Sequence, residues 1–351
     1  MSTQKSTPAT RAAGAVRIAK FDNIKLFLIF CVVLGHMIER FLTKSPSGAR
    51  VQLWIYLFHM PAFAFLAGLF SKKTVIRRDL RRIFSFVLLY LFMEVLFYLS
   101  SAYVKGMENA VFDPLHEDGI PWFCLSMFWW YLLTLLTKEI RPAVSLPCAV
   151  LAAAAAGFAP PADGLLALLR TAVFYPFFLA GFHTDPRRLL TCLEKPALRA
   201  AGLCAAAGSL AACFLLYSRI GWTIDLFRGK LTYGQLGLTG ASALLAGPLL
   251  RLLAMLVSAV LMLSVMAVIP SRRTFLSGLG SHTLAVYVLH GPVYSVILGT
   301  CEPVLRWIVQ DHILLRCALL SVGIVAVTAP AGELLQTLQA FLRSRNVHSI
   351  I

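Results

Sequence analysis

Apolar runs of spanning length alternate with short polar or basic segments along almost the whole chain. A helix that crosses a bilayer needs roughly 17 to 25 mostly apolar residues. The run SALLAGPLLRLLAML could begin its span before residue 250, and the runs near 122–137 and 165–182 are the shortest. We expect an all-α integral membrane protein, a polytopic bundle of about ten transmembrane helices. The predicted spans lie near residues 24–42, 51–70, 83–103, 122–137, 142–159, 165–182, 197–218, 250–269, 281–299 and 313–330.

The composition excludes an ordinary soluble domain. Hydrophobic residues make up 59% of the chain, charged residues make up only 14%, and the mean hydropathy is +0.77. The 8 cysteines form no C-x-x-C pair and mostly lie inside apolar runs, where we expect small core residues. The usual zinc, hydrolase and phosphate-loop motifs do not occur in the sequence, so no metal is expected.

The basic residues are distributed unevenly between alternate loops. With ten spans, roughly 21 of the 32 Lys and Arg residues fall on the side of the N-terminus, which the positive-inside rule assigns to the cytoplasm. We therefore expect both termini in the cytoplasm, with most of the net charge of +16 at that face. Topology explains most of these residues, so nucleic acid is not an expected partner. The densest cluster, KKTVIRRDLRR after the second span, needs a partner feature before it indicates a site for an anionic ligand.

Both ends of the chain are polar. Residues 1–20 are rich in Ala, Ser and Thr and lack the apolar core of a cleavable signal, so we expect a disordered cytoplasmic tail. The membrane domain is expected over residues 21–335, followed by a cytoplasmic C-terminal tail over residues 336–351.

The first span carries two ionisable residues, Lys25 and His36, on an otherwise apolar helix. Ionisable groups inside a span are costly, and they are functional by default. At about 1.5 Å per residue, Lys25 and His36 lie roughly 16 Å apart along the helix and on nearly the same face. Glu39 or Arg40 could reach one nitrogen of the His36 ring. A carboxylate there would leave the other nitrogen to accept a proton.

Four further polar residues lie at membrane depth: His59, Glu94, Arg170 and His290. His59 is expected at a depth similar to that of His36, because the second span runs back from the outside. A hydrogen bond to a neighbouring helix explains Glu94 and His290 as well as a function does, and it explains Arg170 better. His36 differs from these residues because it shares a face with a cation and has a carboxylate at helical spacing.

Five segments, in the same order, resemble those of one family. FDNIKLFLIFCVVLGH and YLFHMPAFAFLAGLFSKK resemble the opening of the membrane acyltransferase-3 superfamily, in its fucose 4-O-acetylase-like branch. PWFCLSMFWWYL, FYPFFLAGF and LGSHTLAVYVLHGP resemble three later spans of that branch, so the likeness covers residues 20 to about 330. The family commonly has Arg at the position of Lys25, and many relatives have Ser at the position of Ala67. No hydroxyl function is therefore carried over to Ala67.

The resemblance implies an enzyme that moves an acyl group from cytoplasmic acyl-CoA to an extracytoplasmic carbohydrate hydroxyl, with His36 as the central catalytic residue. His36 would take the proton of the attacking hydroxyl, and His59 or His290 would donate to the developing oxyanion. Direct transfer and a covalent acyl-histidine both stay open. Acetyl-CoA is the expected donor, and the residues expected to bind its phosphates are Lys25, Arg77, Arg78, Arg81 and Arg82.

The alternative is a transporter or flippase for a glycan or an anionic metabolite, which also places ionisable groups near the midplane. It predicts matched broken helices in two related halves, and the hydropathy pattern does not show such halves. A purely structural membrane protein would instead tolerate changes at the polar positions. The expected location is a bacterial inner membrane, with lipid, acyl-CoA and an extracytoplasmic or lipid-linked saccharide as partners. The sequence does not select the saccharide, the acyl group or the oligomeric state.

Overall fold

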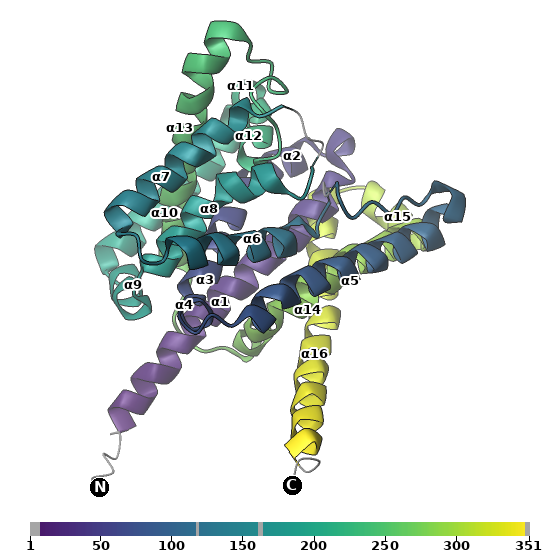
Figure 1. Cartoon of the computed structure of the whole chain (residues 1–351). Helices are drawn as coiled ribbons and strands as arrows, with labels where there is room; N and C mark the ends of the chain where they lie inside the picture. Colours follow the sequence, from purple (N-terminus) through teal and green to yellow (C-terminus); the bar gives the residue numbers. More distant parts are fainter. Residues whose placement is uncertain (1–7, 117–118, 161–163, 348–351) are drawn as a thin grey trace, which may run out of the picture. The chain divides into compact units, whose positions relative to one another are not determined.

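The computed structural model describes residues 8–116, 119–160 and 164–347, and the regular elements of these ranges are helices. This confirms the predicted all-α class. The chain divides into two units. The helices are coloured by residue number, from purple to yellow, in Figure 1. Unit 1 comprises Met1–Lys44 and Ile269–Ile351, and unit 2 comprises Ser45–Val268.

Unit 1 is built from both ends of the chain. Its first helix α1 packs against elements from the C-terminal part of the sequence, including α14 and α16. Lys20, which is only 1% exposed, donates from Nζ to the backbone oxygen of Ile269 at 2.9 Å. Gly280 allows a second close approach to α1, because a Cβ at this residue would lie 2.0 Å from the backbone oxygen of Asp22. The elements of unit 1 are α1 (Pro8–Glu39), η1 (Leu42–Lys44), η5 (Phe275–His282), α14 (Thr283–Thr300), α15 (Glu302–Val309) and α16 (Ile313–Val347).

Unit 2 contains two helices in backbone contact, α3 and α8. A Cβ on Gly68 would lie 1.8 Å from the backbone oxygen of Phe178, and one on Gly181 would lie 2.0 Å from that of Phe65. Small residues let membrane helices approach this closely. The elements of unit 2 are α2 (Pro46–Tyr56), α3 (His59–Leu69), α4 (Lys72–Ile76), α5 (Leu80–Lys105), η2 (Met107–Asn109), α6 (Trp122–Thr137), α7 (Pro142–Ala155), η3 (Ala156–Phe158), α8 (Leu168–His183), α9 (Pro186–Leu193), α10 (Pro196–Leu215), α11 (Tyr217–Ile220), η4 (Gly221–Thr223), α12 (Ile224–Arg228) and α13 (Gly240–Val268).

The predicted second span is a broken helix. The α-helical path is interrupted between α2, which ends at Tyr56, and α3, which begins at His59. Pro61 has no amide proton to donate to the carbonyl of Leu57, and its ring crowds that carbonyl, so the helix is weakened at this point. The interruption places His59 at the first position of α3.

Seven helices within the described ranges are long and apolar enough to cross a membrane, which supports a multi-pass membrane protein. The predicted spans near 122–137, 142–159 and 165–182 appear as the shorter helices α6, α7 with η3, and α8. A helix of 16 residues such as α8 rises roughly 24 Å. That is less than the bilayer core of about 30 Å, so the count of ten stays a prediction. Helix α13 begins at Gly240, earlier than the predicted start at residue 250.

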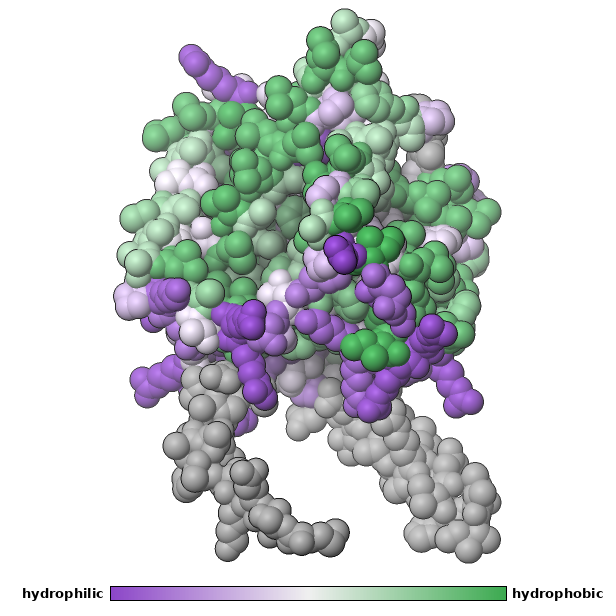
Figure 2. All heavy atoms as spheres, turned by 60° about the vertical axis from the view of Figure 1, so that its left-hand side comes forward, coloured by the Kyte–Doolittle hydropathy of each residue, from purple (hydrophilic) through white to green (hydrophobic). Residues whose placement is uncertain are grey.

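Hydrophobic residues cover much of the face seen in Figure 2. Helix α5 alone leaves Leu88 69% exposed and Phe92 56% exposed. Such exposed apolar side chains suit contact with lipid rather than with water.

At the chain ends, α1 begins at Pro8 and α16 continues to Val347, while residues 1–7 and 348–351 lie outside the described ranges. The predicted tail boundaries stay predictions.

Candidate active site

Unit 1 brings two histidines together from opposite ends of the sequence. His36 lies in the last turn of α1, and His290 lies in the middle of α14. Their ring centroids are 5.7 Å apart, and the ring planes are inclined by 34°. The His36 side chain is 24% exposed, whereas His290 is fully buried at 0%. His36 is therefore the more exposed ring of the pair.

Glu39 lies beside the His36 ring, as the helical spacing predicts. The His36 Nδ1 atom is 3.5 Å from the Glu39 Oε2 atom, and the Glu39 side chain is 39% exposed. A carboxylate at this position favours a proton on Nδ1, which leaves Nε2 with its lone pair. Hydrogen bonds of catalytic residues are often long before substrate binds. The arrangement therefore suits His36 as a proton acceptor.

Backbone carbonyls orient the His290 ring. The His290 Nδ1 atom lies 2.8 Å from the Tyr287 oxygen and 3.0 Å from the Val286 oxygen. Carbonyl oxygens only accept hydrogen bonds, so Nδ1 carries the proton. The neutral ring then has an acceptor at Nε2, which does not match the oxyanion donor expected from the sequence.

Arg40 and Tyr294 extend the contact between α1 and α14. The Arg40 guanidinium lies 5.7 Å from the centre of the Tyr294 ring, and that ring lies 6.3 Å from the His290 ring. Tyr294 was not predicted as a site residue. Its signal is the four-residue spacing from His290, which places both side chains on one face of α14.

His59 belongs to unit 2, so its predicted depth, similar to that of His36, stays a prediction. It is 4% exposed, and its Nδ1 atom lies 2.8 Å from the backbone oxygen of Ile55, across the break between α2 and α3. The centre of the Tyr56 ring lies 4.9 Å from the centre of the His59 ring. These contacts tie the His59 side chain to the last turn of α2. Glu94, on α5, is half-buried.

The predicted basic cluster is at one end of unit 2. Its four arginines are exposed around the α4–α5 turn, and Asp79 caps α5 by accepting from the Arg82 backbone amide at 3.2 Å. Lys72 donates to the backbone oxygen of Thr184 at 2.9 Å, which joins this end to the α8–α9 turn. The Arg188 backbone amide and other nearby donors and cations hold the pKa of the Asp185 carboxyl below its usual value. The four arginines are Arg77, Arg78, Arg81 and Arg82.

Lys25 belongs to unit 1, whereas the four arginines belong to unit 2. Its Nζ atom lies 2.7 Å from the Asp22 Oδ1 atom, one turn earlier on α1. The side chain remains 27% exposed. An anionic ligand at Lys25 would thus meet an ammonium group already held by a carboxylate.

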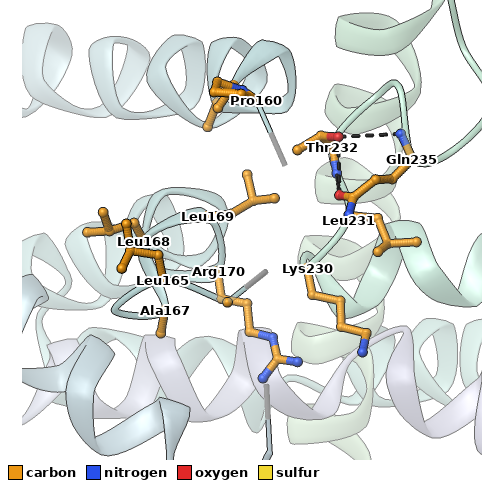
Figure 3. A pocket seen from close by; sticks show the side chains of 13 residues that line it. Pro160, Leu165, Ala167, Leu168, Leu169, Arg170, Lys230, Leu231, Thr232 and Gln235 are labelled. Carbon is orange, nitrogen blue, oxygen red and sulfur yellow. Dashed lines mark hydrogen bonds between the residues drawn. The ribbon is translucent and has the colours of Figure 1, made fainter. Parts of the chain in front are cut away.

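A cavity of about 370 Å³ lies in unit 2, between η3, the start of α8 and the loop at residues 230–235 (Figure 3). Leucines line part of it, and the side chains of Arg170 and Lys230 lie on the same side (Figure 3). Arg170 also donates to the backbone oxygen of Gly119 at 3.3 Å and lies 5.0 Å from the centre of the Trp122 ring. These contacts fit the structural role that the sequence favoured for Arg170.

Two buried side chains anchor the loop that forms one wall of this cavity. The Tyr233 hydroxyl donates to the backbone oxygen of Ala154 at 2.6 Å, and burial raises the pKa of this hydroxyl. Arg251, 0% exposed, donates to the oxygens of Leu226 at 2.9 Å and Leu231 at 3.0 Å. Arg251 was not predicted as a functional or anchoring residue, although a single Arg inside an apolar run is the same signal that pointed to Lys25.

Comparisons with known proteins give a family match over most of the chain. The family model described as "Acyltransferase domain", acyltransferase-3, matches residues 18–331. A nodulation protein NolL from Sinorhizobium fredii is 28% identical over 192 residues, which cover 49% of this chain and 50% of the relative. A nodulation protein NolL from Mesorhizobium japonicum is 27% identical over 180 residues, 47% of each chain. The chain thus spans about half the length of these curated relatives. No solved structure matches it.

Proposed function

Because this chain belongs to the acyltransferase-3 family, we propose that it is a membrane O-acyltransferase that transfers an acetyl group from cytoplasmic acetyl-CoA to a hydroxyl of an extracytoplasmic saccharide. The family match supports acyl transfer. The contact between His36 and His290 is the single observation that supports the assignment of residues, because it gathers two imidazoles and a carboxylate in one unit.

His36 is the proposed general base. Its ring is open to substrate, and Glu39 favours the tautomer with a lone pair on Nε2. As the sugar oxygen attacks the thioester carbonyl, its proton moves to the Nε2 atom. The new C–O bond forms, the C–S bond breaks, and the leaving CoA sulfur takes the proton from the imidazolium. The products are the acetyl ester and CoA thiol, and His36 returns to its neutral state.

The basic cluster of unit 2 is the proposed contact for the phosphates of acetyl-CoA. Arg77, Arg78, Arg81 and Arg82 are exposed and lie in the segment that the positive-inside rule assigns to the cytoplasm. Arginine is well suited to phosphate because its planar fork donates two parallel hydrogen bonds. Lys25 would add a point charge at the cytoplasmic end of α1.

The contacts of α8 support a path with ten crossings and cytoplasmic termini. At its end, the hydrogen bond from Lys72 to Thr184 joins α8 to the segment that precedes α5. Near its start, the Leu166 amide donates to the Leu115 oxygen at 2.7 Å, which joins α8 to the loop that follows α5. The end of α8 therefore lies near the start of α5, and the start of α8 lies near the end of α5. The two helices span the same depth in opposite directions. Crossings by α6, α7 and α8 would together bring the count to ten.

The proposed acceptor is a saccharide on the non-cytoplasmic side of a bacterial inner membrane. The curated relatives are described as nodulation proteins of the bacteria Sinorhizobium fredii and Mesorhizobium japonicum, which supports a bacterial setting. Acetyl is the proposed acyl group because the resemblance is to an acetylase branch, and succinyl-CoA is the competing donor to include in the test.

Substitution of His36 tests the proposal. In the full chain in lipid nanodiscs, we expect wild type to bind acetyl-CoA saturably and to hydrolyse its thioester slowly with water in place of the sugar. His36→Ala should lower hydrolysis by about 10²- to 10⁴-fold, because the general base is removed. Acetyl-CoA binding should persist in this variant.

His116→Ala is the matched control. His116 is an exposed loop histidine paired with Asp113 at 2.9 Å, and its removal should leave hydrolysis unchanged. Ordinary turnover in His36→Ala would overturn the assignment of the base. Absence of acetyl-CoA and succinyl-CoA binding from every form would reject the acyltransferase proposal and favour a transporter.

A further inference from the structure

The buried face of His290 carries an acceptor without a donor. Its Nδ1 proton is directed to two backbone oxygens of α14, at 2.8 Å and 3.0 Å, so the neutral ring has its lone pair on Nε2. The residue is 0% exposed. Within the described chain, no protein group donates a hydrogen bond to this nitrogen. Buried acceptors in native proteins nearly always have a partner, so Nε2 calls for a donor from a bound molecule.

His36 cannot supply that donor in its proposed resting state. Glu39 favours the proton on the His36 Nδ1 atom, so its Nε2 atom is an acceptor as well. Two neighbouring rings, with centroids 5.7 Å apart, therefore each offer one lone pair. Two acceptors cannot satisfy each other, whereas one molecule with two adjacent hydroxyl groups can satisfy both.

We propose that the two histidines bind a vicinal diol of the acceptor saccharide. One hydroxyl gives its proton to His36 and becomes acylated, while the adjacent hydroxyl donates a hydrogen bond to the Nε2 atom of His290. This inference rests on the proposed function and adds the substrate class: a sugar with a free hydroxyl next to the acylated one. His290 then contacts substrate as a specificity residue and does not donate to the oxyanion.

The geometry also gives a reason for selectivity. A site with a buried acceptor rejects an analogue that lacks the matching hydroxyl, because that analogue leaves the acceptor unpaired. A lone alcohol would satisfy His36 and leave Nε2 of His290 without a donor. The expected discrimination against a mono-alcohol is about tenfold or more, the loss that follows when one buried hydrogen bond is not made.

Nitrogen NMR of the full chain in nanodiscs tests the binding step without requiring catalysis. The protein is labelled with ¹⁵N-histidine, and the His290 signals are assigned by their loss in His290→Gln. In the free protein we expect Nδ1 protonated and Nε2 unprotonated. Titration with 1,2-ethanediol should move the Nε2 signal, and titration with ethanol to the same concentration should move it much less. Signals of the exposed His116 serve as the control for solvent effects.

Acetyl transfer to the same two alcohols tests the consequence. Wild type should acetylate 1,2-ethanediol about tenfold faster than ethanol after correction for the number of hydroxyl groups. His290→Leu, which removes the acceptor, should abolish this preference. His290→Gln, whose side-chain oxygen can accept near the position of Nε2, should restore part of it. A merely structural role for His290 would change both rates together and leave their ratio intact.

The outcomes separate the two proposals. A diol-dependent shift of Nε2 without turnover of acetyl-CoA or succinyl-CoA would retain the diol site and reject the acyltransferase. Turnover that depends on His36, together with an Nε2 signal that does not shift with 1,2-ethanediol, would support the acyltransferase proposal and overturn the diol site. The Nε2 atom could also show a hydrogen bond in the free protein that the diol does not change. That result would identify a resident water and would overturn the diol site.

Discussion

At the scale of single residues, burial separates two side chains of the same type. His36 is 24% exposed and lies beside a carboxylate, while His290 is fully buried and held by the carbonyls of its own helix. An exposed imidazole can exchange protons with substrate and solvent. A buried imidazole in a fixed tautomer presents only one kind of hydrogen-bonding group. The same chemical group can therefore serve as a base in one place and as a selector in the other.

Arg81→Gln tests the phosphate contact in the basic cluster. Arg81 is exposed at the start of α5, so its ion pair with a phosphate is screened by water. We expect the dissociation constant for acetyl-CoA to rise by at most about fivefold, with a weaker dependence on salt. Arg219→Gln is the control, because Arg219 is also exposed but lies on the side predicted to be non-cytoplasmic. Equal losses of affinity in both variants would contradict a localised phosphate site.

The sequence located the local part of the candidate site but missed the tertiary part. His36 and Glu39 are three residues apart on one helix, so helical geometry alone predicted their contact. His290 reaches His36 only through packing of α1 against α14, which no local pattern encodes. The buried contact of Lys20 with Ile269 was not predicted either. The partner of Lys20 is a backbone oxygen, a contact that side-chain patterns cannot predict.

At the scale of elements, long apolar helices were predictable and their interruptions were less so. Hydropathy identified seven of the spans with the length that a bilayer requires. Pro61 favours the break between α2 and α3, but the apolar run through it hides the interruption. The backbone contact between α3 and α8 needs two glycines on different helices, Gly68 and Gly181, at matching heights. The one-dimensional pattern does not record such matches between helices.

Gly68→Ala tests the contact between α3 and α8. A new Cβ would lie 1.8 Å from a backbone oxygen of α8, so one helix must move. We expect a loss of about 1–3 kcal/mol in unfolding free energy, as for other overpacked interiors. The measurement is the unfolding midpoint in a fixed detergent.

Gly208→Ala is the matched control on α10. A Cβ there meets nothing within 4 Å, and alanine favours a helix over glycine by roughly 1 kcal/mol. We expect Gly208→Ala to be neutral or slightly stabilising. Similar stability of the two variants would contradict the close packing of α3 on α8.

At the scale of the whole molecule, three short apolar helices decide the topology. If α6, α7 and α8 all cross, the chain crosses ten times and the C-terminus shares the side of the N-terminus. If none of them crosses, the seven long helices place the two termini on opposite sides. The two paths also differ in the location of the α9–α10 segment, which carries Arg187, Arg188 and Lys195.

Alkaline phosphatase fusions distinguish the two paths, because this reporter is active only outside the cytoplasm. We expect inactive fusions after Glu139, after Lys195 and at the C-terminus, and an active fusion after Ala110. The Ala110 position is non-cytoplasmic on both paths, so it is the positive control. Activity at both Lys195 and the C-terminus would contradict the ten-crossing path.

The composition of unit 1 has a consequence for biosynthesis. Helix α1 is translated first, whereas its packing partners η5, α14 and α16 belong to the last part of the chain. During most of translation, α1 is therefore present without these partners. Lys20 then lacks Ile269, and His36 lacks His290. A chain that stops before α14 can insert its helices, yet it contains only one of the two paired histidines. The His36–His290 pair would then form only when synthesis is almost complete, so the part of the candidate site that is proposed to select the acceptor is assembled last.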